Sequence, residues 1–230
     1  MKRIYFVTEG VTDQIVIQGL VENWLGDEDF VPNRIQPPSS AYAEELDSNL
    51  SEGWKGVLSW CRGVRAAGSA GRDEAMRQAD CLFIHIDADV ASDAAFCNPP
   101  LDSPCPPASS AADWVREHLM TVLGGEVPAK VVLCVPAQDM EAWVVSALHP
   151  GLADQHAPIE CREEPGTLLV QQAPYRLVRR KDGRLKKDTK KYQDAVRAIV
   201  SGWGNCASGE TPRCAEAARF EQEARLVLGQ

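Results

Sequence analysis

Hydrophobic residues in the first two thirds of the chain follow two spacings in turn. Short apolar runs rich in β-branched and aromatic residues predict strands over residues 2–8, 31–36, 81–87 and 130–135. Apolar residues three or four positions apart predict helices over residues 12–24, 49–66, 111–123 and 140–148. This alternation predicts an α/β fold, with a Rossmann-like parallel sheet of about four strands flanked by helices.

The pattern changes after His149. Residues 150–175 contain Pro and Gly with weak periodicity, and a turn at residues 181–184 predicts a hairpin. Helices are predicted over residues 192–201 and 213–228, separated by a loop that contains Gly and Cys. We therefore expect a sheet domain over residues 1–149 and a mainly helical C-terminal extension over residues 150–230.

Length and composition are those of a globular protein. The chain has 230 residues, of which 44% are hydrophobic and 25% charged. Apolar runs such as Val131–Ala137 are far shorter than the roughly 20 residues that span a bilayer. The apolar stretch after Met1 is also shorter than the apolar part of a secretory signal, about 7–15 residues. We expect a cytoplasmic protein with no membrane contact, and the sequence leaves its oligomeric state open.

The eight cysteines fit that compartment. They include no CxxC pair, and the closest pairs, Cys97/Cys105 and Cys206/Cys214, lack the spacing of a zinc knuckle. Cys81 and Cys134 lie inside apolar runs, where a thiol acts as a small hydrophobic group. We expect reduced thiols rather than a metal site or disulfides.

The net charge of −9 hides a basic segment. Residues 176–191 contain nine basic and only two acidic residues. A concentrated positive segment on an acidic protein predicts contact with a polyanion. The expected nucleic-acid contacts are Arg176, Arg179, Arg180, Lys181, Arg184, Lys186 and Lys191. A hairpin that is merely solvated would explain the same composition.

Carboxylates follow three of the predicted strands. The first pair is Glu9 and Asp13, where Gly10 permits a sharp turn into the helix. The other pairs are Asp87 with Asp89, and Asp139 with Glu141. Parallel α/β sheets place their sites at the carboxyl ends of strands, so the six acids are expected to converge.

Close carboxylates repel one another and stay ionised only when a cation compensates them. Mg²⁺ or Mn²⁺ would do so, because hard divalent ions take carboxylate oxygens while keeping sites for water and phosphate. One or two such ions would suit phosphodiester cleavage.

Structural roles would account for several residues taken singly. Asp13 and Asp139 are suited to cap the helices that follow them, and Asp89 to cap a loop. His85 shares strand parity with Asp87, and either contacts the site or is simply buried in a central strand.

The ordered set of motifs resembles the Toprim domain, which topoisomerases, primases and the overcoming-lysogenization-defect (OLD) nucleases share. The resemblance covers residues 1–148 and rests on VTEGVTD (7–13), FIHIDADV (83–90) and VPAQDMEAW (135–143). The last motif and CAEAARFEQE (214–223) are also similar to stand-alone bacterial Toprim proteins found near defence genes.

The resemblance implies a role for each acid. Glu9 would be a metal ligand or general acid/base, and Asp87 and Asp89 would hold the catalytic ion. OLD-like nucleases add acids that match Asp13, Asp139 and Glu141, which implies a second ion. They also use a downstream lysine to stabilise the transition state. Spacing leaves Lys181, Lys186, Lys187, Lys190 and Lys191 as candidates, and we favour Lys187 and Lys190.

The resulting hypothesis is a divalent-metal-dependent nuclease that cuts DNA or RNA. The resemblance suggests the toxic effector of a prokaryotic antiviral defence system as its setting. No GxxxxGK[ST] loop is present, so any ATP control would come from an ATPase or another defence protein in trans.

Two other functions stay open. A non-catalytic, nucleic-acid-binding or regulatory subunit would keep the sheet and use the basic segment as its contact. A haloacid-dehalogenase-like phosphatase would use Asp87 as nucleophile, but that fold normally carries its DxD on the first strand, whereas here a strand with Glu9 precedes it.

Overall fold

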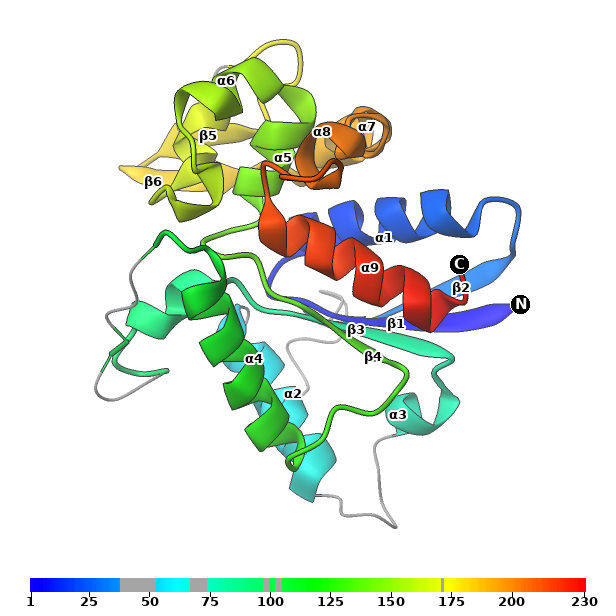
Figure 1. The fold of residues 1–230 in the computed structure, drawn as a ribbon. Coiled ribbons are helices and arrows are strands. Elements are labelled where there is room, and N and C mark those ends of the chain that lie inside the picture. Colours follow the sequence, from blue (N-terminus) through cyan, green and yellow to red (C-terminus); the bar gives the residue numbers. More distant parts are fainter. Residues whose placement is uncertain (38–52, 67–73, 97–99, 102–104, 171) are drawn as a thin grey trace.

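The structure is a computed structural model that describes residues 1–37, 53–66, 74–96, 100–101, 105–170 and 172–230. Its centre is a sheet of four parallel strands in the order β2-β1-β3-β4 (Figure 1). The strands are β1 (Lys2–Val7), β2 (Phe30–Gln36), β3 (Cys81–His85) and β4 (Val131–Cys134). The predicted α/β class and parallel four-stranded sheet are confirmed.

The sequence explains which strands lie inside. Every residue of β3 and β4 is buried, as their continuous apolar runs require. β2 contains Pro32, which donates no ladder hydrogen bond, and it lies at an edge of the sheet.

Helices cover both faces of the sheet (Figure 1). One face is covered by α1 (Val11–Leu25) and α9 (Ala215–Leu228), the other by α2 (Trp54–Ala66) and α4 (Ser109–Leu123). α5 (Glu141–Leu148) and α7 (Thr189–Ser201) belong to the same hydrophobic cluster as α1 and α9, and α7 packs against α1 and α5. Side chains of β3 alternate between the two faces: Phe83 packs with the first group, and Leu82 and Ile84 with the second.

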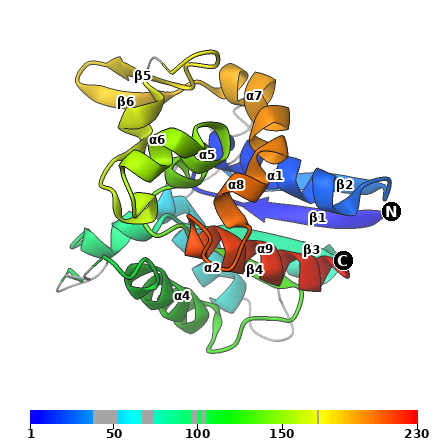
Figure 2. The ribbon, with the colours of Figure 1, turned by 45° about the horizontal axis from the view of Figure 1, so that its top comes forward.

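Shorter elements complete the described chain. They are α3 (Glu74–Gln78), α6 (Pro150–Gln155), α8 (Trp203–Ala207), the 3-10 turns at Ala88–Ser92, Ile159–Cys161 and Pro165–Leu169, and the hairpin strands β5 (Val178–Lys181) and β6 (Arg184–Lys187). Figures 1 and 2 place the hairpin at the end of the molecule opposite the two termini.

The C-terminal extension shares its core with the sheet. The ring of Phe220 on α9 lies 5.7 Å from Trp24, 6.0 Å from Phe83 and 5.8 Å from Trp143. These four aromatic residues come from α1, β3, α5 and α9, and all are buried. The division at residue 149 stays a prediction, because both parts contribute to one hydrophobic cluster.

Several local predictions need correction. Cys105 and Cys161 form a disulfide, contrary to the expectation of reduced thiols. Cys97 lies outside the described residues, and the other five cysteines are free and buried. The predicted Gly/Cys loop contains α8, and residues 49–52 of the helix predicted over 49–66 lie outside the described residues. None of the helices in the described ranges is both long and apolar enough to cross a membrane.

Replacing Phe220 with alanine tests the shared core. Phe220→Ala removes a fully buried ring and is expected to lower the free energy of unfolding by about 3–5 kcal/mol. Leu226→Ala is the matched control on α9, because Leu226 is 80% exposed and should change the stability by less than about 0.5 kcal/mol. Urea unfolding measures both, and equal losses would contradict a core shared by α9 and the sheet.

Candidate active site

The strand order brings the first two acid motifs together. β1 is followed by β2 on one side and β3 is followed by β4 on the other, so the connections leave the carboxyl edge in opposite directions between β1 and β3. Such a switch point is where open α/β sheets bind ligands. Glu9 follows β1 and Asp87 follows β3, and the Asp87 backbone N–H donates to Glu9 Oε1 at 2.8 Å.

The loop after β4 joins the same edge. The Met140 backbone N–H donates to Asp87 Oδ1 at 3.0 Å. Backbone hydrogen bonds from Ala88 to the Pro136 carbonyl and from Asp89 to the Gln138 carbonyl continue the pairing of β3 with β4 beyond the strands. Three strand ends are thereby linked through two carboxylates, which fixes one oxygen of each.

Asp139 and Asp13 occupy different local environments. Asp139 Oδ1 accepts from the Glu141 backbone N–H at 3.0 Å, so the helix-start role considered for Asp139 is present. Asp13 lies inside the first turn of α1, and its carboxylate Oδ2 lies 2.8 Å from where a Cβ on residue 10 would be. A side chain at Gly10 would therefore push Asp13 away.

Lys187 enters the site from the hairpin. Its Nζ lies 3.2 Å from Asp13 Oδ1 and 2.7 Å from Glu141 Oε2. Tyr192, on α7, donates its hydroxyl to the other oxygen of Glu141 at 2.6 Å. Asp13, Glu141 and Tyr192 are almost completely buried. Together with Lys187 they form what we call the inner half of the site.

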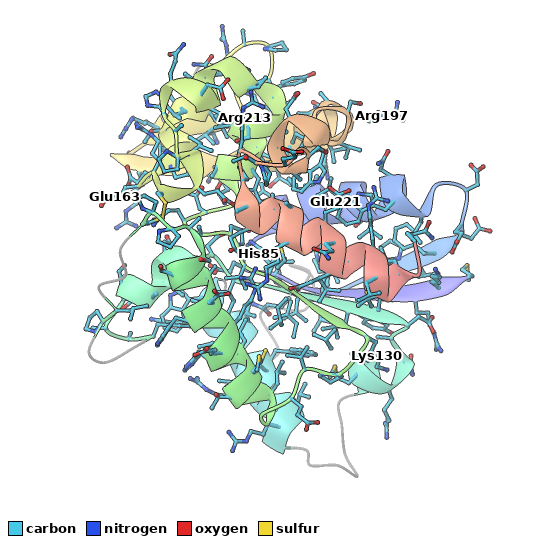
Figure 3. The ribbon with its side chains drawn as sticks, viewed as in Figure 1. His85, Lys130, Glu163, Arg197, Arg213 and Glu221 are labelled. Carbon is cyan, nitrogen blue, oxygen red and sulfur yellow. A yellow bond between two sulfur atoms is a disulfide. The ribbon has the colours of Figure 1, made fainter. Side chains whose placement is uncertain are left out.

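His85 lies on the inner side of Asp87. Its Nε2 is 3.2 Å from Asp87 Oδ1, and the ring is fully buried in the interior of the molecule (Figure 3). Burial lowers the pKa of His85, but Asp87 outweighs that effect and raises the pKa to about 9. His85 is therefore both a buried strand residue and a neighbour of the site.

The carboxylates of the site differ in whether a counter-charge lies beside them. Burial, and then Asp87, raises the pKa of Glu9 well above its usual range. Burial, and then Glu141, does the same to the pKa of Asp139. The exposed Asp89 has a pKa of about 7, because partial desolvation and then Asp87 disfavour its charged form. Burial also acts on Asp13, but there Lys187 prevails and lowers the pKa.

A hard divalent cation matches this charge and donor set. The second oxygens of Glu9 and Asp87 have no hydrogen bond or ion pair within the described part of the chain. As placed, however, no group of three or more His, Cys, Asp or Glu side chains among the described residues is arranged to hold a metal ion. The fit is therefore one of chemistry and charge, and the side chains do not form a coordination shell.

Of the two favoured lysines, the structure brings only Lys187 to the acids. Lys190 is exposed on the first turn of α7, and it has no ion pair within the described part of the chain. The predicted nucleic-acid contacts lie on or beside the hairpin: Arg176, Arg179, Arg180, Lys181, Arg184 and Lys186 are exposed, and Lys191 donates to the Arg176 carbonyl at 3.1 Å.

Tyr192 is the site residue that the sequence did not reveal. Its place at an apolar helix position gave it the signature of a core residue, and it is indeed fully buried. No local sequence pattern marks it as a partner of Glu141. Comparisons with protein-family models, with curated proteins and with solved structures found no match for this chain.

The charge cluster predicts how stability depends on pH without metal. Glu9, Asp89, Asp139 and His85 all have raised pKa values in the folded state, so the folded protein binds more protons than the unfolded chain. The free energy of unfolding in chelator should therefore fall as the pH rises from about 4 to about 9. Urea unfolding at several pH values measures it, and Mg²⁺ should stabilise the protein more at pH 8 than at pH 5.

Asp89→Asn provides a variant for this test. Removing an exposed carboxylate of the cluster should flatten the fall below about pH 7, whereas Asp27→Asn, at an exposed aspartate after α1, should leave it unchanged. Stability that stays level or rises between pH 5 and pH 9 would contradict the described electrostatics.

Proposed function

We propose that this protein is a Toprim-like, divalent-metal-dependent nuclease that hydrolyses phosphodiester bonds in DNA or RNA. The observation that carries the proposal is the assembly of acids from three parallel strand ends at the switch point of the sheet. Hydrogen bonds from the backbone orient Glu9 and Asp87 there, and each keeps an oxygen that has no hydrogen bond or ion pair with another described residue. This is the donor set and the place that a metal-assisted hydrolase needs.

Each residue has a definite role in the proposed reaction. Glu9, Asp87 and Asp89 would hold Mg²⁺ or Mn²⁺, with Asp139 beside them. When bound, such an ion supplies an activated water and stabilises charge on the scissile phosphate. Burial and Asp87 raise the pKa of Glu9 when no cation is bound, so a divalent ion would favour its ionised, ligating form. The ammonium of Lys187 adds positive charge next to the same acids.

The hairpin supports a nucleic acid as the substrate class. Arg179 pairs with Lys186 across the two strands, and Lys181 pairs with Arg184. Like charges directly opposite each other destabilise a hairpin unless an anion lies across them. All four side chains are exposed, and none has an ion pair within the described part of the chain. A phosphate backbone would supply the missing negative charge.

Alternation along β6 connects this face to the acids. Successive side chains of a strand point to opposite faces, so Lys186 lies on the outer face and Lys187 on the inner one. Strand β6, whose outer side chains would contact the phosphate backbone of a nucleic acid, therefore also carries Lys187.

The biological setting follows from the resemblance alone. We propose a cytoplasmic effector of antiviral defence, controlled by an ATPase or another defence protein in trans. The Cys105–Cys161 disulfide would be unusual for a cytoplasmic protein, because stable disulfides are rare in the cytosol. Counting free thiols in protein isolated under denaturing, alkylating conditions would decide whether the bridge exists in cells.

A non-catalytic nucleic-acid-binding subunit is the second candidate. Two observations favour it. Lys187 already forms ion pairs with Asp13 and Glu141. Among the described residues, no three His, Cys, Asp or Glu side chains are arranged to hold a metal ion. Metal-independent binding without cleavage of any substrate would support it.

Substitution of the ligating acids tests the nuclease. Glu9→Gln and Asp87→Asn preserve shape but remove charge, and each is expected to lower Mg²⁺-dependent cleavage by at least about 10²-fold. Supercoiled DNA, single-stranded DNA and tRNA are incubated with Mg²⁺, Mn²⁺ or chelator. Glu117→Gln, at an exposed glutamate of α4, is the matched control and should cleave like the original protein. Undiminished cutting by both acid variants would refute the assignment.

The salt dependence of binding tests the hairpin. The double variant Arg179→Gln/Lys186→Gln removes one cross-strand pair of charges from the outer face. The slope of log K against log salt concentration should become shallower by about 0.7–0.9 for each lost phosphate contact. Fluorescence anisotropy with labelled nucleic acid measures it in chelator. Arg197→Gln, exposed on α7, should leave the slope unchanged, and equal slopes for all three proteins would exclude the hairpin as the contact.

A further inference from the structure

The inner half of the site already contains a cation. Asp13 and Glu141 face each other across the ammonium of Lys187, which lies 3.2 Å from one carboxylate and 2.7 Å from the other. Both acids are almost fully buried, at 2% and 1% exposure, so water screens their charges only weakly. Within the described part of the chain, Lys187 is the cation that pairs with either acid.

The surrounding structure holds this arrangement in place. Tyr192 donates to Glu141 Oε1, which leaves Oε2 of the same carboxylate for the lysine. Gly166 approaches the stem of Glu141 so closely that a Cβ there would lie 3.4 Å from Glu141 Cγ. Asp188, directly after Lys187, accepts the Lys191 backbone N–H and starts α7. The lysine is therefore anchored by the helix that begins beside it.

An ammonium and a divalent ion would compete for these oxygens. Both would need the inward-facing oxygens of Asp13 and Glu141, and two positive charges at that separation repel strongly at low dielectric. Filling the inner half with a second ion would require Lys187 to leave two buried carboxylates. The outer half, with Glu9, Asp87 and Asp89, has no lysine or arginine ion pair in the described residues.

We propose that Lys187 is the built-in cation of the Asp13–Glu141 half, and that the site consequently takes one divalent ion, on the Glu9–Asp87–Asp89 half. The inference rests on the proposed metal-dependent function and specifies how many ions that function uses. Lys187 then occupies the place of a second metal, with its charge supplied by the chain.

Counting bound Mn²⁺ tests this proposal without any activity measurement. The full chain is titrated with Mn²⁺, and the free ion is followed by its electron paramagnetic resonance signal. The original protein should bind one ion. Lys187→Met removes the ammonium at similar length and should bind two. Lys186→Met, one residue away on the opposite face of β6, is the control and should bind one.

A further variant covers the case in which Lys187→Met does not fold. Lys187→Gln removes the charge but keeps a polar end that can donate to the inner acids, and it should also bind two ions. Circular dichroism checks the fold of both variants, and one ion on a folded Lys187→Gln protein would overturn the inference.

The outcomes separate this inference from the function on which it rests. Two ions on the original protein would overturn the inference and leave the metal-dependent function standing. One ion on a folded Lys187→Met protein would also overturn it, because the inner acids would then not form a metal position. No bound ion on the original protein would overturn both.

Discussion

The mutual repulsion of carboxylates at one edge of a parallel sheet is the constraint on which the site depends. Burial raises the pKa values of Glu9 and Asp139, and repulsion from a neighbouring carboxylate raises them further. The chain answers with oriented backbone N–H groups and with the Lys187 ammonium, which lowers the pKa of Asp13 instead. The acids of the outer half have no lysine or arginine ion pair among the described residues, and to this half we assign the proposed divalent cation.

The C-terminal segment is part of both the core and the candidate site. Phe220 of α9 packs against Phe83 of β3 in the aromatic core. The hairpin supplies Lys187 as the counter-charge of Asp13 on α1 and Glu141 on α5. Removing the segment would expose that core and leave two buried carboxylates without a counter-charge. The same hairpin has a basic outer face, so the proposed nucleic-acid contact and the counter-charge of the buried acids belong to one two-stranded element.

Prediction from the sequence succeeded for the strands and helices, which depend on the spacing of apolar residues along the chain. Continuous apolar runs indicated the buried strands β3 and β4, and helical periodicity indicated α1, α4 and α5. The convergence of Glu9 with Asp87 followed from their positions after parallel strands. The disulfide between Cys105 and Cys161 was missed because its partners are 56 residues apart and no local pattern pairs them.

The sequence by itself determined the parallel sheet and the edge at which the acids gather, because strand periodicity and strand ends are local properties. Only the tertiary structure decided which lysine contacts the acids, because Lys187 and Asp13 are 174 residues apart in the chain. The register of the hairpin makes that choice: with a side-chain period of two, a shift by one residue would turn Lys186 inward in place of Lys187. Tyr192 likewise became a partner of Glu141 only through the packing of α7 against α5.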